Sequence, residues 1–385
     1  MGIRIDGWDD IRCRATQILE DLHARDEHRS LEPAPNDLIN LCSNDYLGLT
    51  QHTEWQSYLR RQIKGKMGAG ASRLLGGDAA IFSQVETEFS QFKSAESSLF
   101  FGSGYAANES VIQTLARLEP HFFSDAWNHA SIIDGFRVAR IPESQRTVFR
   151  HADLEQLESR LSASESPINV IITESLFSMD GDTADLHQFL ELARKHRAIL
   201  VVDEAHALGV LGCDGRGAID AAGLDHHEII SVNTLGKALG AQGAFVTGPS
   251  WFREMLINFA RPFIFSTAPS PWLAEAISLV LQQLPKLERR RERLKSMSSL
   301  VLQQLQAAGL DTGESNSHII PVIVGAASEA LHLAQHLKGA GFFIRAIRPP
   351  TVAPNSSRIR ISLTADLQQS DAKRLVEAIC QWEYS

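Results

Sequence analysis

The chain has 385 residues, of which 44% are hydrophobic and 22% charged, and its formal net charge is −9. These values predict a globular protein of two or three structural units, and the acidic balance argues against a nucleic-acid-binding surface. The four cysteines are scattered, which disfavours a disulfide framework and a metal site. The first residues lack an apolar stretch and no run approaches 18 apolar residues, so we expect a cytoplasmic protein with no membrane span.

Helical and strand-like segments alternate through the first two thirds of the chain. Helix-spaced apolar residues occupy 78–95 and 185–197, and short apolar runs occupy 98–101, 170–173, 198–202, 229–232 and 244–247. These runs are brief and do not alternate with polar residues, as is typical of strands buried on both faces of a sheet. We therefore predict an α/β fold, with a mostly parallel sheet in a large domain spanning residues 44–285.

The last third of the chain has a different pattern. Residues 269–310 predict a long helix whose basic run, 289–295, forms a solvated face. Strand-like runs follow at 319–324, 342–347 and 358–363, with helices predicted at 328–339 and 367–382. We predict a smaller α+β domain over residues 286–385. Residues 1–43 are too few to form a core and are expected to pack against it.

A buried strand-like run ends on three polar residues, Asp203, Glu204 and His206. Ligands of open α/β sheets gather at the carboxyl ends of strands, so these residues mark a candidate site rather than only a polar strand end. The same DEAH string occurs in helicase ATPases, which also need GxxxxGK[ST] ahead of it. The nearest segment, 231–238, lacks the first Gly and the final Ser/Thr and follows DEAH. An ATPase is therefore excluded.

Lys237 lies 34 positions after Asp203 (237 minus 203), in a glycine-rich turn that follows another apolar run. If Lys237 is considered alone, the simplest interpretation is a solvated charge on the protein surface. Beside a strand-end carboxylate it fits pyridoxal 5′-phosphate (PLP), which bonds covalently to a lysine amine and is activated when an acidic residue keeps its ring nitrogen protonated. Thr234 offers the phosphate a hydroxyl from the same turn.

A second phosphate site is predicted at FGSGY, residues 101–105. The strand here runs into Gly102, Ser103 and Gly104, and a helix begins near Tyr105. Free amides at a helix N-terminus bind phosphate through hydrogen bonds and the helix dipole. Since most glycine-rich loops only turn the chain, this segment supports a cofactor site only together with Lys237.

Nine strings, in one order along the chain, carry a specific resemblance. They are NDYLGL (Asn44–Leu49), GAGASR (Gly68–Arg73), FGSGYAAN, DAWNHAS, ESLFSMDGD (Glu174–Asp182), VVDEAH, TLGKALG, RPFIFSTA and IRPPTV (Ile347–Val352). In these strings the chain resembles the α-oxoamine synthase family of fold-type I PLP enzymes, over essentially its whole length. The resemblance implies a PLP-dependent acyltransferase that condenses an amino acid with an acyl thioester and releases CO2 and the thiol carrier.

The resemblance also implies roles for single residues. Lys237 would hold the cofactor, Asp203 would pair with its ring nitrogen, and His129 would stack on its ring. His206 and Ser178 would contact the cofactor as well, and Lys237, His129, Asp203 and His206 would form the catalytic group. The residues implied to hold the phosphate are Gly104, Tyr105, Thr234 and, from a second subunit, Ser266 and Thr267. The last pair implies a homodimer with shared sites.

The substrates are implied in the same way. The residues expected to meet them are Asn44, His129, Arg348, Thr351 and Arg29. Arg348 would bind the amino-acid carboxylate with two hydrogen bonds. No motif marks the arginine that meets the acyl group, so Arg25 remains the alternative to Arg29.

Within this resemblance, the IRPPTV segment implies L-alanine and a pimeloyl thioester as substrates, the acyl group being carried by coenzyme A or by an acyl carrier protein. A glycine-using family member is the alternative. A non-catalytic subunit is disfavoured because all four catalytic residues are present.

Overall fold

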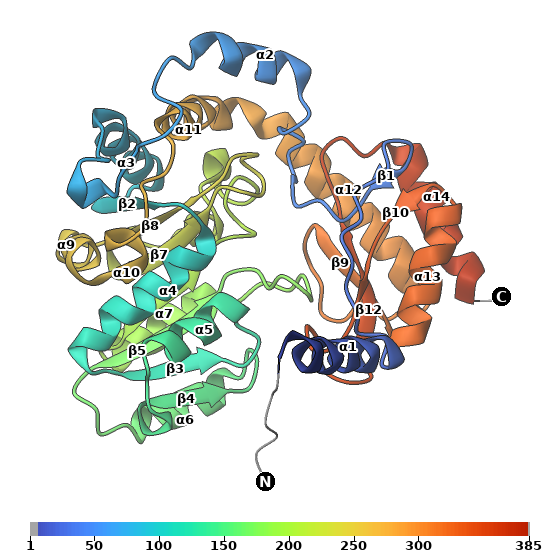
Figure 1. Cartoon of the computed structure of the whole chain (residues 1–385), viewed down its shortest axis with the longest axis horizontal. Helices are drawn as coiled ribbons and strands as arrows, with labels where there is room; N and C mark the ends of the chain where they lie inside the picture. Colours follow the sequence, from blue (N-terminus) through green and yellow to red (C-terminus); the bar gives the residue numbers. More distant parts are fainter. Residues whose placement is uncertain (1–6, 384–385) are drawn as a thin grey trace.

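The computed structural model of the protein describes residues 7–383 (Figure 1). Two bodies lie side by side, one built on a seven-stranded sheet and the other on a three-stranded sheet. Helices α11 (Pro271–Gln283) and α12 (Glu288–Ala307) run from the first body to the second. A short 3-10 turn, Leu284–Leu287, interrupts the long helix expected there, because Pro285 removes a backbone donor.

The larger sheet has the strand order β2-β8-β7-β6-β5-β3-β4. Its strands are β2 (Ser97–Phe101), β3 (His121–Asp125), β4 (Arg146–Phe149), β5 (Asn169–Glu174), β6 (Ile199–Asp203), β7 (Ile229–Thr234) and β8 (Ala244–Gly248). All neighbours pair in parallel except β8, which is antiparallel to both β7 and β2. The predicted α/β fold with a mostly parallel sheet is therefore confirmed. The apolar runs did not reveal β3 and β4, which both begin with a polar residue.

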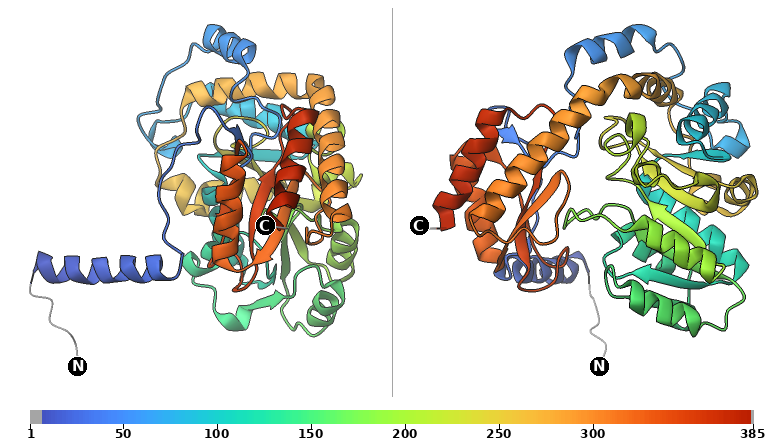
Figure 2. Two further views of the ribbon diagram at one scale, coloured as in Figure 1. Left: turned by 90° about the vertical axis from the view of Figure 1, so that its right-hand side faces the viewer. Right: turned by 180° about the vertical axis from the view of Figure 1, so that it is seen from behind.

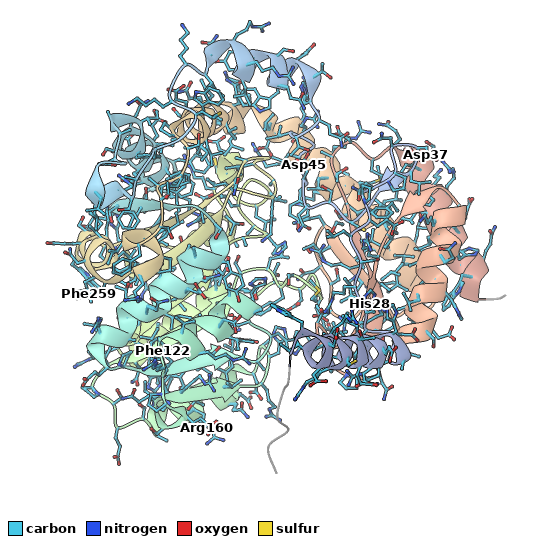
Figure 3. The ribbon with its side chains drawn as sticks, in the orientation of Figure 1. His28, Asp37, Asp45, Phe122, Arg160 and Phe259 are labelled. Atoms are coloured by element: carbon cyan, nitrogen blue, oxygen red, sulfur yellow. The ribbon has the colours of Figure 1, made fainter. Side chains whose placement is uncertain are left out.

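Helices cover both faces of this sheet. One face carries α4 (Gly104–Leu115), α5 (Ala130–Val138), α9 (Ser250–Phe259) and α10 (Arg261–Ile264), and the other carries α6 (Leu154–Ser162), α7 (Leu186–Lys195) and α8 (Ala218–Ala221). Successive strand residues point to opposite faces, so Val170 and Ile172 pack in the first layer and Ile171 in the second. Figure 3 shows Phe122 inside the body and Arg160 at its periphery.

The smaller sheet is antiparallel, in the order β11-β12-β9. Its strands are β9 (Ile319–Gly325), β11 (Ala346–Ile347) and β12 (Ser357–Ser362), and its helices are α12, α13 (Ala327–Gly339) and α14 (Gln369–Glu383). A separate pair joins β1 (Ile39–Asn40) to β10 (Phe342–Phe343) in parallel. The single strand expected at 342–347 is thus two strands, because the chain changes its pairing partner between them. His28 and Asp37, before β1, lie beside this body (Figure 3).

Three further helices complete the described chain: α1 (Trp8–Ala24), α2 (Thr53–Gln62) and α3 (Ala80–Lys93). Helix α3 packs against β2 and α11. Helix α1 projects from the rest of the protein and has no buried residue, with Trp8 85% exposed (Figure 2). Across residues 7–383, no helix combines the length and the hydropathy that crossing a membrane requires.

Candidate active site

The carboxyl ends of β6 and β7 bring Asp203 and Lys237 to one cavity. The two strands are parallel neighbours, with Asp203 opposite Val232, and the loop after β7 closes through a hydrogen bond from the Leu235 amide to the Gly243 carbonyl (2.9 Å). The cavity has a volume of about 310 Å³. The predicted site residues that line it are Asn44, Gly104, Tyr105, His129, Asp203, His206, Thr234 and Lys237.

Two hydrogen bonds fix the carboxylate of Asp203. Its Oδ1 accepts from the Ala205 amide (2.8 Å), and its Oδ2 accepts from Asn108 Nδ2 (2.7 Å). Asn108 lies on α4 and also donates to Ser131 Oγ (2.9 Å). The sequence prediction missed Asn108, although it is the last residue of the FGSGYAAN string.

Lys237 has the environment of a reactive amine. Burial lowers its pKa, and the charges of Asp203 and Glu174 oppose that effect. A lowered pKa increases the fraction of neutral amine, which is the form that attacks a carbonyl carbon.

An anion cradle lies at the N-terminus of α4. Ser103 caps this helix by accepting a hydrogen bond from the Ala106 amide (3.1 Å). A Cβ atom on Gly104 would lie 2.3 Å from Thr234 Cγ2, so only glycine lets Thr234 approach the helix end so closely. The methyl group of Thr234 therefore packs on the start of α4, while its hydroxyl donates to the Ala205 carbonyl (3.3 Å). Thr234 and the N-terminus of α4 line the same cavity, and the free amides of a helix N-terminus suit a phosphate.

The two predicted histidines differ in their surroundings. His129 caps α5, its Nδ1 lies 2.8 Å from Ser131 Oγ, and its exposed ring lines the cavity. His206 is buried, with Nδ1 2.6 Å from the Tyr46 hydroxyl. Burial and the nearby Lys237 charge hold the pKa of His206 well below its usual value. His206 is therefore a neutral hydrogen-bonding group at physiological pH.

Glu174 is an unpredicted member of the cavity wall. It stands opposite Asp203 in the β5–β6 register and is 2% exposed. One of its oxygens, Oε1, has no hydrogen-bond partner. Burial, followed by the charge of Asp203, raises the pKa of Glu174 well above its usual value. Burial therefore favours the protonated form of this carboxyl group, which lies beside the carboxylate of Asp203.

The sequence model of the aminotransferase class I and II family matches residues 36–379. The chain belongs to this family. It is 41% identical over 352 residues to a putative 8-amino-7-oxononanoate synthase of Geobacillus kaustophilus, covering 89% of this chain and 88% of the relative. Other curated relatives, at 38 to 42% identity, carry the name 8-amino-7-oxononanoate synthase.

Two solved structures show the same architecture. A serine palmitoyltransferase from S. paucimobilis, described with a bound PLP–myriocin adduct, has a TM-score of 0.86 at 26% identity, covering 96% of this chain and 97% of that chain. An 8-amino-7-oxononanoate synthase from Francisella tularensis has a TM-score of 0.78 at 27% identity, covering 91% and 100%. The resemblance to α-oxoamine synthases and the fold-type I architecture, both predicted from the sequence, are thus confirmed.

In this aminotransferase-family chain an unpredicted arginine, Arg360, lies beside the cavity. It is 7% exposed, and it donates from Nη1 to Asn44 Oδ1 (3.1 Å) and from Nη2 to the Tyr46 hydroxyl (3.5 Å). Its Nε bonds the carbonyl of Ser178. Among residues 7–383, no carboxylate forms an ion pair with it. The sequence feature that could have indicated this role is an arginine within the strand Ser357–Ser362 (SRIRIS). All residues of this strand are buried.

Other predicted site residues lie outside this cavity. Ser178 meets Arg360 through its backbone carbonyl, and its side chain does not line the cavity. Ser266 and Thr267 are exposed and line a smaller cavity of about 200 Å³, which shares Ser103 with the first.

A third cavity, of about 710 Å³, contains Arg29, Arg348 and Thr351. Arg29 Nη2 donates to Thr351 Oγ1 (3.2 Å), and the Arg348 guanidinium bonds the Asp26 carbonyl. Burial and the charge of Arg29 lower the pKa of Arg348. The structure therefore brings Arg29 and Thr351 together but does not place Arg348 beside Lys237.

Proposed function

We propose that this protein is a PLP-dependent acyltransferase of biotin biosynthesis. It condenses L-alanine with a pimeloyl thioester to give 8-amino-7-oxononanoate, CO2 and the free thiol carrier. The observation that carries the proposal is the convergence of Lys237 and Asp203 at the ends of adjacent strands in one cavity. The names of the relatives at about 40% identity support this substrate pair over others.

The residues of the cavity fit PLP on structural grounds. A lysine with a lowered pKa, an oriented carboxylate and a phosphate cradle line the same space of about 310 Å³. PLP, when bound, withdraws electrons from the α-carbon of an attached amino acid. Lys237 would hold the cofactor, Asp203 would keep a proton on its ring nitrogen, and Thr234 with the α4 amides would hold its phosphate.

The remaining steps are performed by the side chains of this chain. The amine of Lys237, once released, removes the α-proton of alanine and later returns a proton to the product. His129, which lines the cavity, is assigned to pack on the cofactor and to exclude water from one face of it. Neutral His206, held by Tyr46, donates or accepts a hydrogen bond without adding a charge.

Two arginines are candidates for binding the carboxylate of alanine. Arg348 was the sequence-based choice, but it lies in the third cavity, whereas Arg360 contacts Asn44 on the wall of the cavity that holds Lys237. A buried guanidinium with no carboxylate partner among the described residues favours a carboxylate ligand. We assign the alanine carboxylate to Arg360. Arg348 then lies beside Arg29, where the acyl substrate enters.

The third cavity suits the acyl group. Two of its three arginines, Arg29 and Arg348, line a volume of about 710 Å³ beside Thr351, which adds a hydroxyl. A pimeloyl chain ends in a carboxylate, which needs a cation or several hydrogen bonds when it leaves water. Arg25, the alternative, instead forms an ion pair with Glu27 (3.5 Å). Arg29 is therefore the better partner for the distal carboxylate.

A cytoplasmic homodimer with shared sites is part of the proposal. Ser266 and Thr267 are exposed next to Phe265, which is 69% exposed, and their cavity adjoins the α4 cradle through Ser103. Such a surface suits contact with a second copy. Light scattering measures the oligomeric state. Mixed dimers of Lys237→Ala and Thr267→Ala subunits test whether sites are shared, because one of the two sites would then regain both residues.

Product formation tests the function. Purified protein with PLP is supplied with pimeloyl coenzyme A or a pimeloyl acyl carrier protein, and with alanine, glycine or serine. Formation of 8-amino-7-oxononanoate from alanine supports the proposal and identifies the carrier. A preference for glycine with a short acyl thioester would reassign the chain to the glycine-using members. Serine is included because serine palmitoyltransferase shares the architecture.

A further inference from the structure

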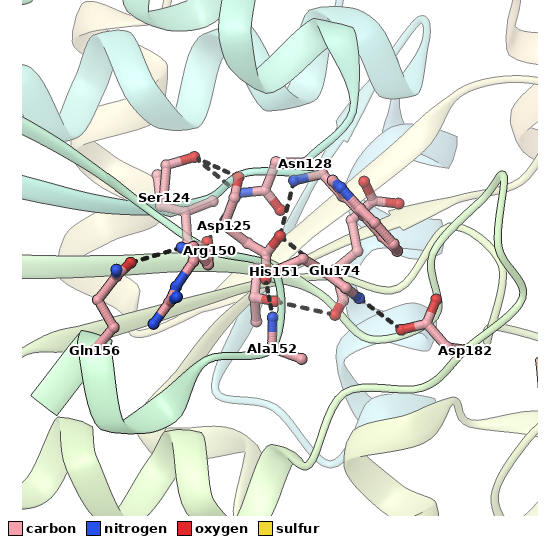
Figure 4. Close-up of polar contacts among 12 residues, drawn as sticks. Ser124, Asp125, Asn128, Arg150, His151, Ala152, Gln156, Glu174 and Asp182 are labelled. Carbon is pink, nitrogen blue, oxygen red and sulfur yellow. Dashed lines mark hydrogen bonds and ion pairs between the residues drawn. The ribbon is translucent and has the colours of Figure 1, made fainter. Parts of the chain in front are cut away.

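His151 connects two loops of the site without lining the cavity. It follows strand β4, and both of its ring nitrogens face carboxylates: Nδ1 lies 3.0 Å from Asp125 Oδ1, and Nε2 lies 2.9 Å from Asp182 Oδ2 (Figure 4). A neutral imidazole has one N–H and can donate to only one of these groups. Only the protonated ring satisfies both.

The carboxylates hold this proton. Burial acts to lower the pKa of His151, but the hydrogen bonds and charges of Asp125 and Asp182 outweigh it and raise the pKa to about 9. Trp127 stacks on the ring with 3.9 Å between centroids, an arrangement that favours a cation. His151 is therefore an imidazolium across the physiological pH range.

Within residues 7–383, Asp125 and Asp182 are the charged groups that act on the pKa of His151. Phe177 meets the ring edge-on at 4.4 Å and is neutral, as is Trp127. The adjacent cation, Arg150, is paired with Asp153 (2.6 Å).

Through Asp125, His151 is connected to the turn that contains His129. Asp125 ends strand β3 and begins the turn of residues 125–129, in which its Oδ1 also accepts from the Trp127 amide (2.8 Å). Its Oδ2 accepts from the Ala152 amide (3.1 Å). Asp125 thus ties the start of this turn to the residues that follow β4.

Through Asp182, His151 is connected to the loop that contacts Arg360. Asp182 belongs to the bridging loop (residues 175–183), which spans from β5 to the smaller body. In this loop the Ser178 carbonyl bonds Arg360, Asp180 pairs with Arg358, and Thr183 accepts from Asn316 Nδ2 (2.9 Å). Asp182 Oδ1 has no hydrogen-bond partner, so this carboxylate depends on His151.

We infer that His151 is a positioning residue that clamps the bridging loop to the 125–129 turn and so fixes Arg360 at the amino-acid subsite. The inference rests on the proposed function, since it assigns the amino-acid carboxylate to Arg360. Without the imidazolium between them, the carboxylates of Asp125 and Asp182 repel each other and the loop loosens. The Ser178 carbonyl then no longer holds Arg360 in one orientation.

The test compares His151→Gln with His121→Gln in the PLP-loaded protein. His121 is a matched control, because its ring also links β3 to β4, through Thr147 Oγ1 (2.8 Å), but meets no carboxylate. We expect His151→Gln to raise the dissociation constant for L-alanine, measured from the change in cofactor absorbance, about 10-fold, with kcat within about 3-fold. Amide hydrogen exchange of residues 175–183 should accelerate in His151→Gln only.

A second variant and a pH series test the inference even if His151→Gln fails to fold. Asp182→Asn keeps the shape of the loop, removes one carboxylate and should also weaken L-alanine binding. Wild-type protein should lose protection of the bridging loop as the pH rises through about 9, after correction for intrinsic exchange. Unchanged alanine binding together with unchanged loop protection in folded variants would overturn the inference.

The proposed function has a separate outcome. If no amino acid changes the wild-type absorbance, that function fails, and the carboxylate assignment of Arg360 fails with it. Amide hydrogen exchange of residues 175–183 would then test only whether His151 holds the bridging loop in place.

Discussion

Asn108 Nδ2 lies 2.7 Å from Asp203 Oδ2, which joins helix α4 to the end of strand β6. The N-terminus of α4 is the proposed phosphate cradle, and Asp203 is the proposed partner of the ring nitrogen. One hydrogen bond therefore sets the spacing between the two groups that, in the proposed function, would hold the phosphate and the ring nitrogen of the same cofactor. This relationship gives Asn108 a role that no single motif expresses.

We expect Asn108→Ala to weaken PLP binding and turnover by about 10-fold each. The loss of one hydrogen bond to a charged group corresponds to roughly 1.5 kcal/mol or more. Titration of the protein with PLP, followed by visible absorbance, measures the affinity. Glu109→Gln, one residue along α4 and outside the cavity wall, is the control and should behave as wild type. Equal PLP affinity in Asn108→Ala and wild type would contradict this role.

Asp203→Asn should lower turnover by on the order of 10²-fold or more. Asparagine keeps the shape of the side chain but removes the negative charge that favours a protonated ring nitrogen. Steady-state rates at saturating PLP separate this effect from weaker cofactor binding. Near-normal turnover would show that the carboxylate at the end of β6 has another task.

Lys237 should be the residue that borohydride links irreversibly to PLP. Reduction followed by peptide mass analysis locates the modified lysine, and Lys237→Ala should give no labelled peptide. The variant should still retain PLP weakly, because Asp203, Thr234 and the α4 amides remain. A label on any other lysine would exclude the assignment.

The sequence predicted those parts of the site that lie in contiguous strings next to apolar runs. Asp203 and Lys237 each follow such a run, and the parallel pairing of β6 and β7 brings them together as the strand-end rule requires. Arg360 was missed because it lies inside a strand, where an apolar face was expected, and its role depends on contacts with Asn44 and Tyr46 over 300 positions away. No local pattern carries such contacts.

The limits of the fold prediction have a similar cause. Runs buried on both faces, such as β5 and β6, were recognised because their consecutive residues Val170–Ile172 and Ile199–Val202 are apolar. The edge strand β4 is only partly buried, so its sequence, Arg146–Phe149, carries little signal. Residues 342–347 were expected as one strand, because apolar content does not show that β10 pairs with β1 and β11 with β12.

Glu174→Gln should be at least as stable as wild type at pH 8. The folded-state pKa of Glu174 is raised, so the native protein retains a proton that the unfolded chain releases above about pH 4.5. The free energy of unfolding of wild type therefore falls, relative to that of the variant, as pH rises from 4.5 towards the folded pKa. Urea unfolding of both proteins at pH 5 and pH 8 measures the difference. A wild type that gains stability over the variant at pH 8 would mean that Glu174 is ionised and paired.

Arg29→Ala should raise the KM for the pimeloyl thioester far more than the KM for an uncharged acyl thioester of equal length. The reason is the distal carboxylate of pimeloyl, which loses its cationic partner, whereas an apolar chain end loses only packing. Loss of a charge-assisted hydrogen bond corresponds to about 2 kcal/mol, or roughly 30-fold. Steady-state kinetics with both thioesters at saturating L-alanine measure the two ratios.

Arg25→Ala is the matched control, because Arg25 lies four residues earlier and pairs with Glu27 instead of Thr351. It should leave both KM values near those of wild type. Equal losses for the two acyl substrates in Arg29→Ala would indicate that Arg29 meets the carrier or holds residues 26–32 in place. A larger effect of Arg25→Ala on the pimeloyl substrate alone would transfer the role to Arg25. Thr351→Val separates these cases further, because it removes the hydroxyl that accepts from Arg29 but leaves the cation in the cavity, so its KM effect should be smaller than that of Arg29→Ala.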